Sequence, residues 1–125
     1  MDLIIGGFYQ GKLEYAKEKH GLLPDDISFA DEKSGADFSC RCICDFEKYL
    51  LYAFRQDASR ERADICAFPL RDDAVIIAND ISCGVVPMDP ETRAWREYCG
   101  RTLSDLAGKC VSVTRVFCGI PMRIK

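Results

Sequence analysis

The chain has little of what membrane, nucleic-acid and histidine-based sites require. Its 125 residues include one histidine and one tryptophan, and no apolar run is long enough to span a bilayer. Neither sign of charge dominates, because 17 basic side chains stand against 20 acidic ones and leave a net charge of −3. A binder of nucleic-acid backbones needs a basic excess, so we expect neither nucleic acid nor membrane as a partner. The length predicts one domain over residues 1–125.

Eight cysteines are the one unusual abundance. They are disulfides, metal ligands or reduced thiols that serve as small apolar residues. Residues 1–6 carry no secretory signal, which favours reduced thiols in the cytoplasm. No C-x-x-C pair exists, so no metal site is expected, although a cysteine-based metal or redox protein stays a third reading. The alternating Cys40, Cys42 and Cys44 are expected on one face of a strand.

Apolar runs and helix signals alternate along the chain, which predicts an α/β sheet with helices on both faces. The clearest strand is the apolar run 74–78, of the kind that parallel sheets bury. Asp45 and Asp89 are placed to cap helices, and Gly21 and Gly108 to end them. The expected strands are 3–5, 27–30, 38–44, 74–78 and 111–117, and the expected helices are 12–20, 46–55 and 90–107.

A glycine-rich segment between the first expected strand and helix is the feature that carries chemistry. Gly6, Gly11 and Lys12 match G-x-x-x-x-G-K, the phosphate-binding P-loop or Walker A motif. Glycines let backbone N–H groups wrap an anion, the helix N-terminus adds its dipole, and the lysine neutralises terminal phosphates. A glycine turn that binds nothing is the alternative. The predicted nucleotide-binding residues are Gly6, Gly7, Phe8, Tyr9, Gln10, Gly11, Lys12 and Leu13.

Other polar residues have a structural and a functional interpretation. Asp80 follows the best strand at its carboxyl end, where it would bind Mg²⁺, act as a base, or cap a turn. His20 is expected to be exposed at a helix C-terminus, where a cation suits the dipole. Arg93, Arg96 and Arg101 fall on one helix and are expected on a solvated face, from which one could reach a phosphate.

The chain resembles the adenosylcobinamide kinase / adenosylcobinamide-phosphate guanylyltransferase family of cobalamin biosynthesis. Residues 6–17 stand where that family has G-G-x-x-S-G-K-S-x-x-A-E. Residues 79–87, 100–107 and 118–125 stand where it has N-E-V-G-x-G-I-V-P, G-R-x-N-Q-x-L-A and S-G-I-x-x-K-I-K. The resemblance implies a P-loop NTPase-like (RecA-like) fold, a purine nucleotide (ATP or GTP, with Mg²⁺), a corrinoid substrate and a homo-oligomer.

The chain also departs from the family pattern. Leu13 replaces the hydroxyl residue that binds Mg²⁺, Leu103 and Ser104 replace the Asn-Gln of the late helix, and residues 25–73 lack the histidine that takes the guanylyl group. Two functions therefore stay open. One is a nucleotide-binding P-loop protein that, if active, catalyses kinase or nucleotidyltransferase chemistry through Lys12 and Asp80. The alternative is a non-catalytic binding or assembly module.

Overall fold

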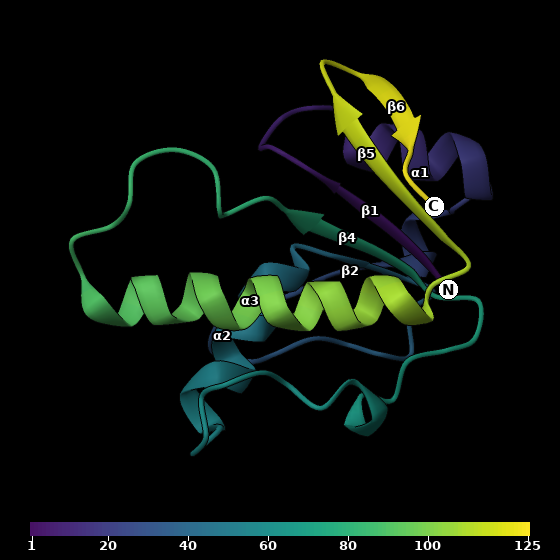
Figure 1. The fold of residues 1–125 in the computed structure, drawn as a ribbon. Helices are drawn as coiled ribbons and strands as arrows, with labels where there is room; N and C mark the ends of the chain where they lie inside the picture. The colour runs from purple at the N-terminus through teal and green to yellow at the C-terminus, as the bar shows by residue number, and fades with distance from the viewer.

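The computed structural model describes residues 1–125 and contains a six-stranded sheet in the order β2-β3-β4-β1-β5-β6 (Figure 1). Neighbouring strands are parallel except for β6, which returns antiparallel to β5 as a hairpin. Such pairing requires crossover connections, and helices supply them except between β2 and β3, where residues 30–41 form a loop. The strands are β1 (Asp2–Gly6), β2 (Ile27–Phe29), β3 (Cys42–Cys44), β4 (Val75–Asn79), β5 (Ser112–Phe117) and β6 (Ile120–Arg123).

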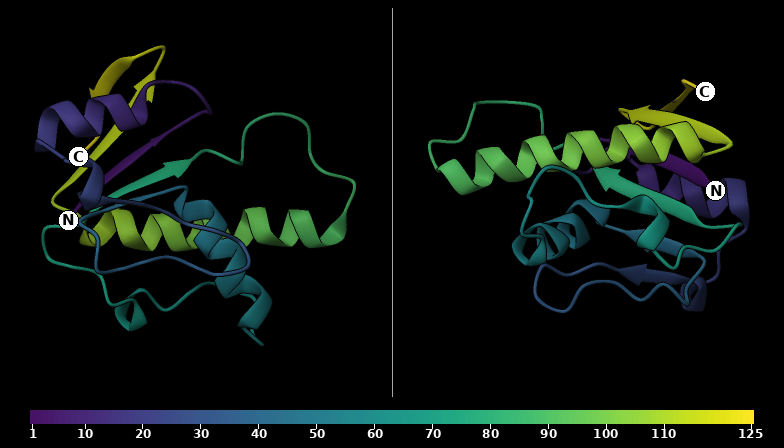
Figure 2. Two further views of the ribbon diagram at one scale, coloured as in Figure 1. Left: turned by 180° about the vertical axis from the view of Figure 1, so that it is seen from behind. Right: turned by 60° about the horizontal axis from the view of Figure 1, so that its bottom comes forward.

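Helices cover both faces of this sheet (Figure 2). Helix α1 (Lys12–His20) packs on one face, against Ile4, Val75 and Ile77. Helices α2 (Phe46–Gln56) and α3 (Pro90–Lys109) cover the other, which contains the larger apolar cluster. Strand β4 is buried along its whole length because it lies between β1 and β3 with helices on both sides. The predicted fold class is confirmed. None of the helices has the length and apolar character needed to cross a bilayer.

The predicted strand over 38–44 is wrong at its beginning. Only Cys42–Cys44 forms β3, because the Asp37 carboxylate accepts hydrogen bonds from the Ser39 N–H and hydroxyl and turns the chain. Cys42 and Cys44 share the α1 face as predicted, with their Sγ atoms 3.9 Å apart, whereas Cys40 lies outside the strand. All eight thiols are free, and four of them, Cys42, Cys44, Cys99 and Cys110, are buried.

The ends of helices α1 and α3 agree with the sequence except at two places. Asp89 caps α3 by accepting from the Thr92 N–H, as predicted, but the helix passes through Gly108 and ends at Lys109, with Cys110 as its C-cap. The prediction of an exposed His20 is also wrong. The end of α1 packs beside the start of β1, so the His20 side chain is only 12% exposed and its Nε2 lies 3.3 Å from the Asp2 carboxylate. Burial lowers the pKa of His20, and Asp2 opposes that shift.

Candidate functional site

The chain between β1 and α1 turns in a loop whose shape depends on glycine. A Cβ on Gly6 would lie 2.4 Å from the Val116 carbonyl oxygen of β5, so no larger residue fits there without moving the sheet. Gly11 has φ +87° and Tyr9 has φ 56°, both in the left-handed region. Such a path turns backbone N–H groups toward the inside of a loop, which is the geometry that anion-binding loops share.

The hairpin at the other end of the chain holds this loop in place. The Cys118 N–H donates to Gln10 Oε1 at 2.6 Å, and the Gly119 N–H donates to the Gln10 carbonyl at 2.9 Å. Both donors belong to the turn between β5 and β6, which lies beside the loop in Figure 1. Gln10 was predicted as a ligand-binding residue, and its contact with the hairpin turn was not foreseen. Its side chain joins segments more than a hundred residues apart.

Lys12, the first residue of α1, is buried, with 7% of its surface exposed. Its Nζ donates to the Gly7 carbonyl, so the ammonium lies within the loop. Burial lowers the pKa of Lys12, while the carboxylates of Glu47 and Asp45 oppose this shift. A buried cation with one backbone carbonyl as acceptor has unused hydrogen-bonding capacity, since an ammonium donates three bonds. An anion entering the loop would use that capacity.

A cavity of about 360 Å³ opens in front of this loop on the α1 face of the sheet. Asp45, directly after β3, lines this cavity. The prediction that its side chain caps the following helix is wrong. Asp45 precedes α2 but does not cap it, because a left-handed backbone (φ 55°) directs its side chain elsewhere. Its carboxylate accepts from Lys48 Nζ at 2.9 Å and from Asn79 Nδ2 at 3.1 Å. The cavity is lined by Phe8, Tyr9, Gln10, Gly11, Lys12, Leu13, Glu14, Phe29, Cys44, Asp45, Lys48, Ile77 and Asn79.

Behind Asp45, a buried carboxylate joins α2 to β4. Glu47 is 1% exposed and accepts from the backbone N–H and the side-chain Nδ2 of Asn79, at 2.9 and 2.7 Å. Burial raises the pKa of Glu47, and the Asn79 hydrogen bonds oppose this rise. The sequence offered no signal for this pair, because a glutamate in the first turn of a helix is usually solvated. Asn79 thus holds both acidic residues at the edge of the cavity.

Leu13 is half-buried against the apolar cluster on the α1 face. Its side chain has no oxygen, so the metal ligand that a serine or threonine would supply is missing. Mg²⁺ in nucleotide sites is often held by one or two carboxylates together with phosphates and water. Asp45 and Glu14 are the carboxylates that line this cavity, and Asp45 is the one fixed by neighbouring side chains. The residues present therefore fit a nucleotide-bound Mg²⁺ through a carboxylate.

Asp80 lies at the same edge of the sheet but borders a different cavity. That cavity, of about 240 Å³, lies on the α3 face and is lined mainly by apolar side chains. The Asp80 carboxylate accepts from the Ser82 N–H at 3.0 Å and from the Cys83 thiol at 3.1 Å. Burial raises the pKa of Asp80, but the hydrogen bonds from Ser82 and Cys83 outweigh it and hold this pKa below its usual value. Lys12 and Asp80 therefore border different cavities, although the Asp80 N–H donates to the Gly6 carbonyl of the loop at 2.9 Å.

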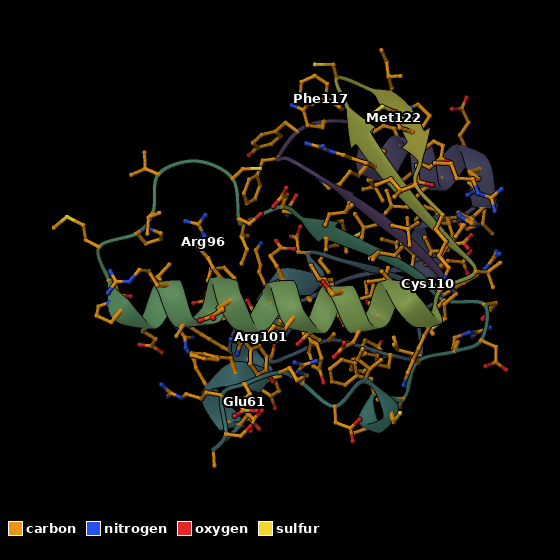
Figure 3. All side chains as sticks on the ribbon, in the orientation of Figure 1. Glu61, Arg96, Arg101, Cys110, Phe117 and Met122 are labelled. Carbon is orange, nitrogen blue, oxygen red and sulfur yellow. The ribbon has the colours of Figure 1, made fainter.

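Arg93, Arg96 and Arg101 were expected together on one solvated face of α3. Arg93 and Arg101 are exposed, but the three side chains do not point to the same side of the helix. Arg93 donates to the carbonyls of Pro87 and Met88, and Arg96 donates to those of Ser82 and Val85. Both hold the loop that precedes the helix. Arg101 points to the opposite side, toward Glu61, whose carbonyl it contacts (Figure 3). A helix turns by about 100° per residue, so residues five apart diverge.

A mostly parallel sheet whose first strand leads through a glycine-shaped loop and a buried lysine into a helix defines an α/β protein of the P-loop-like class. The chain also matches, over residues 42–124, the family model described as cobinamide kinase / cobinamide phosphate guanyltransferase. It belongs to this family, as the resemblance predicted, and a function like that of these enzymes is supported. The matched segment contains Asp45, Glu47, Asn79 and Asp80, whereas the loop at residues 6–13 precedes it. A search of the curated proteins gives no match.

Proposed function

We propose that the chain binds the phosphates of a purine nucleoside triphosphate, ATP or GTP, in the loop Gly6–Lys12, and acts on a corrinoid as its second substrate. The observation that carries this proposal is the buried Lys12 ammonium inside a loop that only glycine at position 6 permits. The family description supplies the corrinoid, since both of its named activities act on cobinamide or its phosphate. All eight cysteines are unpaired, which supports a reducing cytoplasm as the compartment.

The chemistry of the loop follows from three groups. Backbone N–H groups of the loop donate to the phosphate oxygens, and the N-terminus of α1 contributes its positive dipole end. Lys12 exchanges the Gly7 carbonyl for a phosphate oxygen and neutralises charge that develops when a terminal phosphoryl group is transferred. Asp45 would hold the Mg²⁺ that accompanies the nucleotide, and the metal would neutralise part of the phosphate charge. Asp80 stays a second, predicted candidate for the metal or base carboxylate.

Isothermal titration of ATP and of GTP, with and without Mg²⁺, tests the binding. Lys12→Met removes the ammonium but keeps an unbranched side chain, and is expected to weaken binding about 100-fold, or about 2.7 kcal/mol. Lys17→Met is the matched control, because Lys17 is exposed on the same helix; its affinity should stay within about twofold of the parent. A parent chain that binds neither nucleotide, or a Lys12→Met variant that binds as well as the control, contradicts the proposal.

The second candidate function is a module that binds nucleotide without turning it over, and the observation in its favour is Leu13. Replacing Leu13 by serine or threonine restores the hydroxyl that P-loop enzymes use for Mg²⁺. Single-turnover transfer of a phosphoryl group to cobinamide, or of a guanylyl group to cobinamide phosphate, measured in the parent and in Leu13→Ser, separates the two. Turnover by the parent favours the enzyme, whereas binding without turnover in both proteins favours the module.

A further inference from the structure

Three aromatic side chains at the cavity on the α1 face are largely exposed. Phe8 and Tyr9 belong to the loop after β1, Phe29 ends β2, and all three line the cavity. Phe8 is 55% exposed, Phe29 is 62% exposed and Tyr9 is fully exposed. Aromatic rings contribute strongly to binding once a ligand covers them, and exposed apolar groups gathered around a cavity mark a surface that a ligand covers.

Phe29 points to the α1 face of the sheet but lies beyond the part that the helix covers. It pairs with Cys44 in the parallel register of β2 and β3, so both side chains face the same way. Ile27, two residues earlier on β2, faces that way too and packs against the apolar cluster beneath α1. The Phe29 ring therefore continues this apolar surface into solvent, at the edge of the sheet.

Tyr9 is held in a backbone conformation that costs free energy. Its φ is 56°, in the left-handed region that residues other than glycine, asparagine and aspartate rarely adopt. The ring is fully exposed, so contacts within the protein do not offset this cost. The bonds from the β5–β6 turn to Gln10 hold the neighbouring part of the loop in place. Strain of this kind persists mainly where a ligand is bound.

The strand order places Phe29 on the acceptor side of the proposed transfer. Lys12 follows β1 and Asp45 follows β3, so the terminal phosphoryl group and its Mg²⁺ would lie between these two residues. Strand β2 is the next strand beyond β3, and Phe29 therefore lies on the far side of Asp45 from the loop. The acceptor approaches in line, opposite the leaving group, and the second substrate is expected to extend in this direction.

The side chains around the cavity fit a large flat ring that carries amides at its edge. Cobinamide, which the family description names, has such a conjugated ring, and aromatic side chains stack on flat rings. Glu14 and Lys48, both exposed at the same cavity, can accept from and donate to amide groups. We propose that Phe29, with Phe8 and Tyr9, is the contact surface for the corrin ring of the second substrate. This inference rests on the proposed function and places its corrinoid on the β2 side of the cavity.

Variants of Phe29 test this contact, because the residue lies outside the phosphate loop. Phe29→Ala removes the ring, Phe29→Leu keeps apolar bulk without a flat ring, and Phe29→Tyr keeps the ring. Leu23→Ala shortens an exposed apolar side chain outside the cavity and is the control. Isothermal titration of cobinamide follows a check for an unchanged melting temperature. The affinity is expected to fall about tenfold in Phe29→Ala and about threefold in Phe29→Leu, and to stay within about twofold of the parent in the other two.

Titrations of ATP with Mg²⁺ and of inorganic triphosphate separate the outcomes. Both affinities should stay within about twofold of the parent in all four variants, because the phosphates contact the loop after β1 and not β2. A Phe29→Ala and a Phe29→Leu variant that bind cobinamide as well as the parent overturn the proposal. So does a loss of ATP affinity without a loss of triphosphate affinity, because that result places the purine base on Phe29.

The same titrations distinguish failure of this inference from failure of the proposed function. A parent chain that binds ATP but not cobinamide overturns the inference and leaves the nucleotide site intact. A parent chain that binds no nucleotide contradicts the proposed phosphate loop, whereas the effect of Phe29 on cobinamide binding can still be present.

Discussion

Two cavities border the carboxyl edge of the sheet, one on each face, and Asn79 lines both. The cavity on the α1 face is lined by the buried Lys12 and by Asp45, which Asn79 joins to the buried Glu47 behind it. The cavity on the α3 face is apolar, with Asp80 and Arg96 among its few polar residues. Their carboxylates differ accordingly, since burial raises the pKa of Glu47 while local hydrogen bonds lower that of Asp80.

The position of a cavity at the edge of the sheet does not by itself decide which kind of ligand it favours. Both cavities lie where α/β proteins bind ligands. Only the α1 side combines a helix N-terminus, a glycine-shaped loop and a buried cation, all of which favour an anion. On the α3 side, Arg96 donates to backbone carbonyls and Asp80 accepts from its own turn. The charged groups there are used to fold the loop that precedes α3.

The largest expected difference between the regions comes from adding one methyl group to each. Gly6→Ala places a Cβ 2.4 Å from the Val116 carbonyl, so the loop or β5 must move. We expect a loss of about 3 kcal/mol or more in the free energy of unfolding. Gly100→Ala adds a Cβ with nothing within 4 Å, in the middle of α3, and is expected to gain about 0.5–1 kcal/mol. Urea unfolding of both variants measures the contrast, and equal effects would contradict it.

Next in size is the effect of neutralising one carboxylate in each cavity. Asp45→Asn is expected to weaken Mg²⁺-dependent nucleotide binding about tenfold, or about 1.4 kcal/mol, because it removes the proposed metal ligand. Asp80→Asn should leave that affinity within about twofold, since its carboxylate faces the other cavity. Titrations with and without Mg²⁺ decide between them. A larger loss in Asp80→Asn would instead assign the metal to Asp80, as the sequence predicts.

The smallest expected effect is on the pH dependence of the free energy of unfolding, which should change with opposite sign in variants of Glu47 and of Asp80. Glu47 has a raised folded-state pKa, so its contribution to stability is greatest below the ordinary glutamate pKa of 4.5 and is lost as the pH rises through the folded-state pKa. The free energy of unfolding of Glu47→Gln, relative to that of the parent, should therefore rise by about 1 kcal/mol between pH 4 and pH 7. Unfolding free energies across this range, by denaturant titration, measure the slope.

Asp80 provides the matched control for that slope. Its folded-state pKa is lowered, so its contribution to stability is present above the ordinary aspartate pKa of 3.8 and is lost as the pH falls through the folded-state pKa. The free energy of unfolding of Asp80→Asn, relative to that of the parent, should thus fall as the pH rises from 3 to 5. The change should be about a few tenths of a kcal/mol, because the group is partly solvated. Slopes of the same sign in both variants would show that the two carboxylates do not differ in environment.

Local patterns predicted the elements well and the polar contacts poorly. The apolar run 74–78, the Asp89–Pro90 cap and Gly21 each depend on neighbours in the sequence, and the structure confirms all three. Asp45 looked like a cap because caps are defined by position, whereas its left-handed backbone turns the side chain toward Asn79. Arg93 is exposed as expected, but the acceptors of Arg93 and Arg96 were not foreseen, because they are carbonyls of a loop whose path helical spacing does not describe.

The sequence alone determined the α/β alternation, the glycine-rich loop that ends in Lys12, and the resemblance that the family match confirmed. These properties are contained in short stretches of chain, where spacing and residue type decide conformation. Only the tertiary structure decided which groups surround the lysine. The strand order places β4 beside both β1 and β3, and this brings Asn79 to Asp45 and Glu47 across more than thirty residues. Burial then shifts the pKa values of Lys12 and Glu47, and burial is a property of the packed molecule.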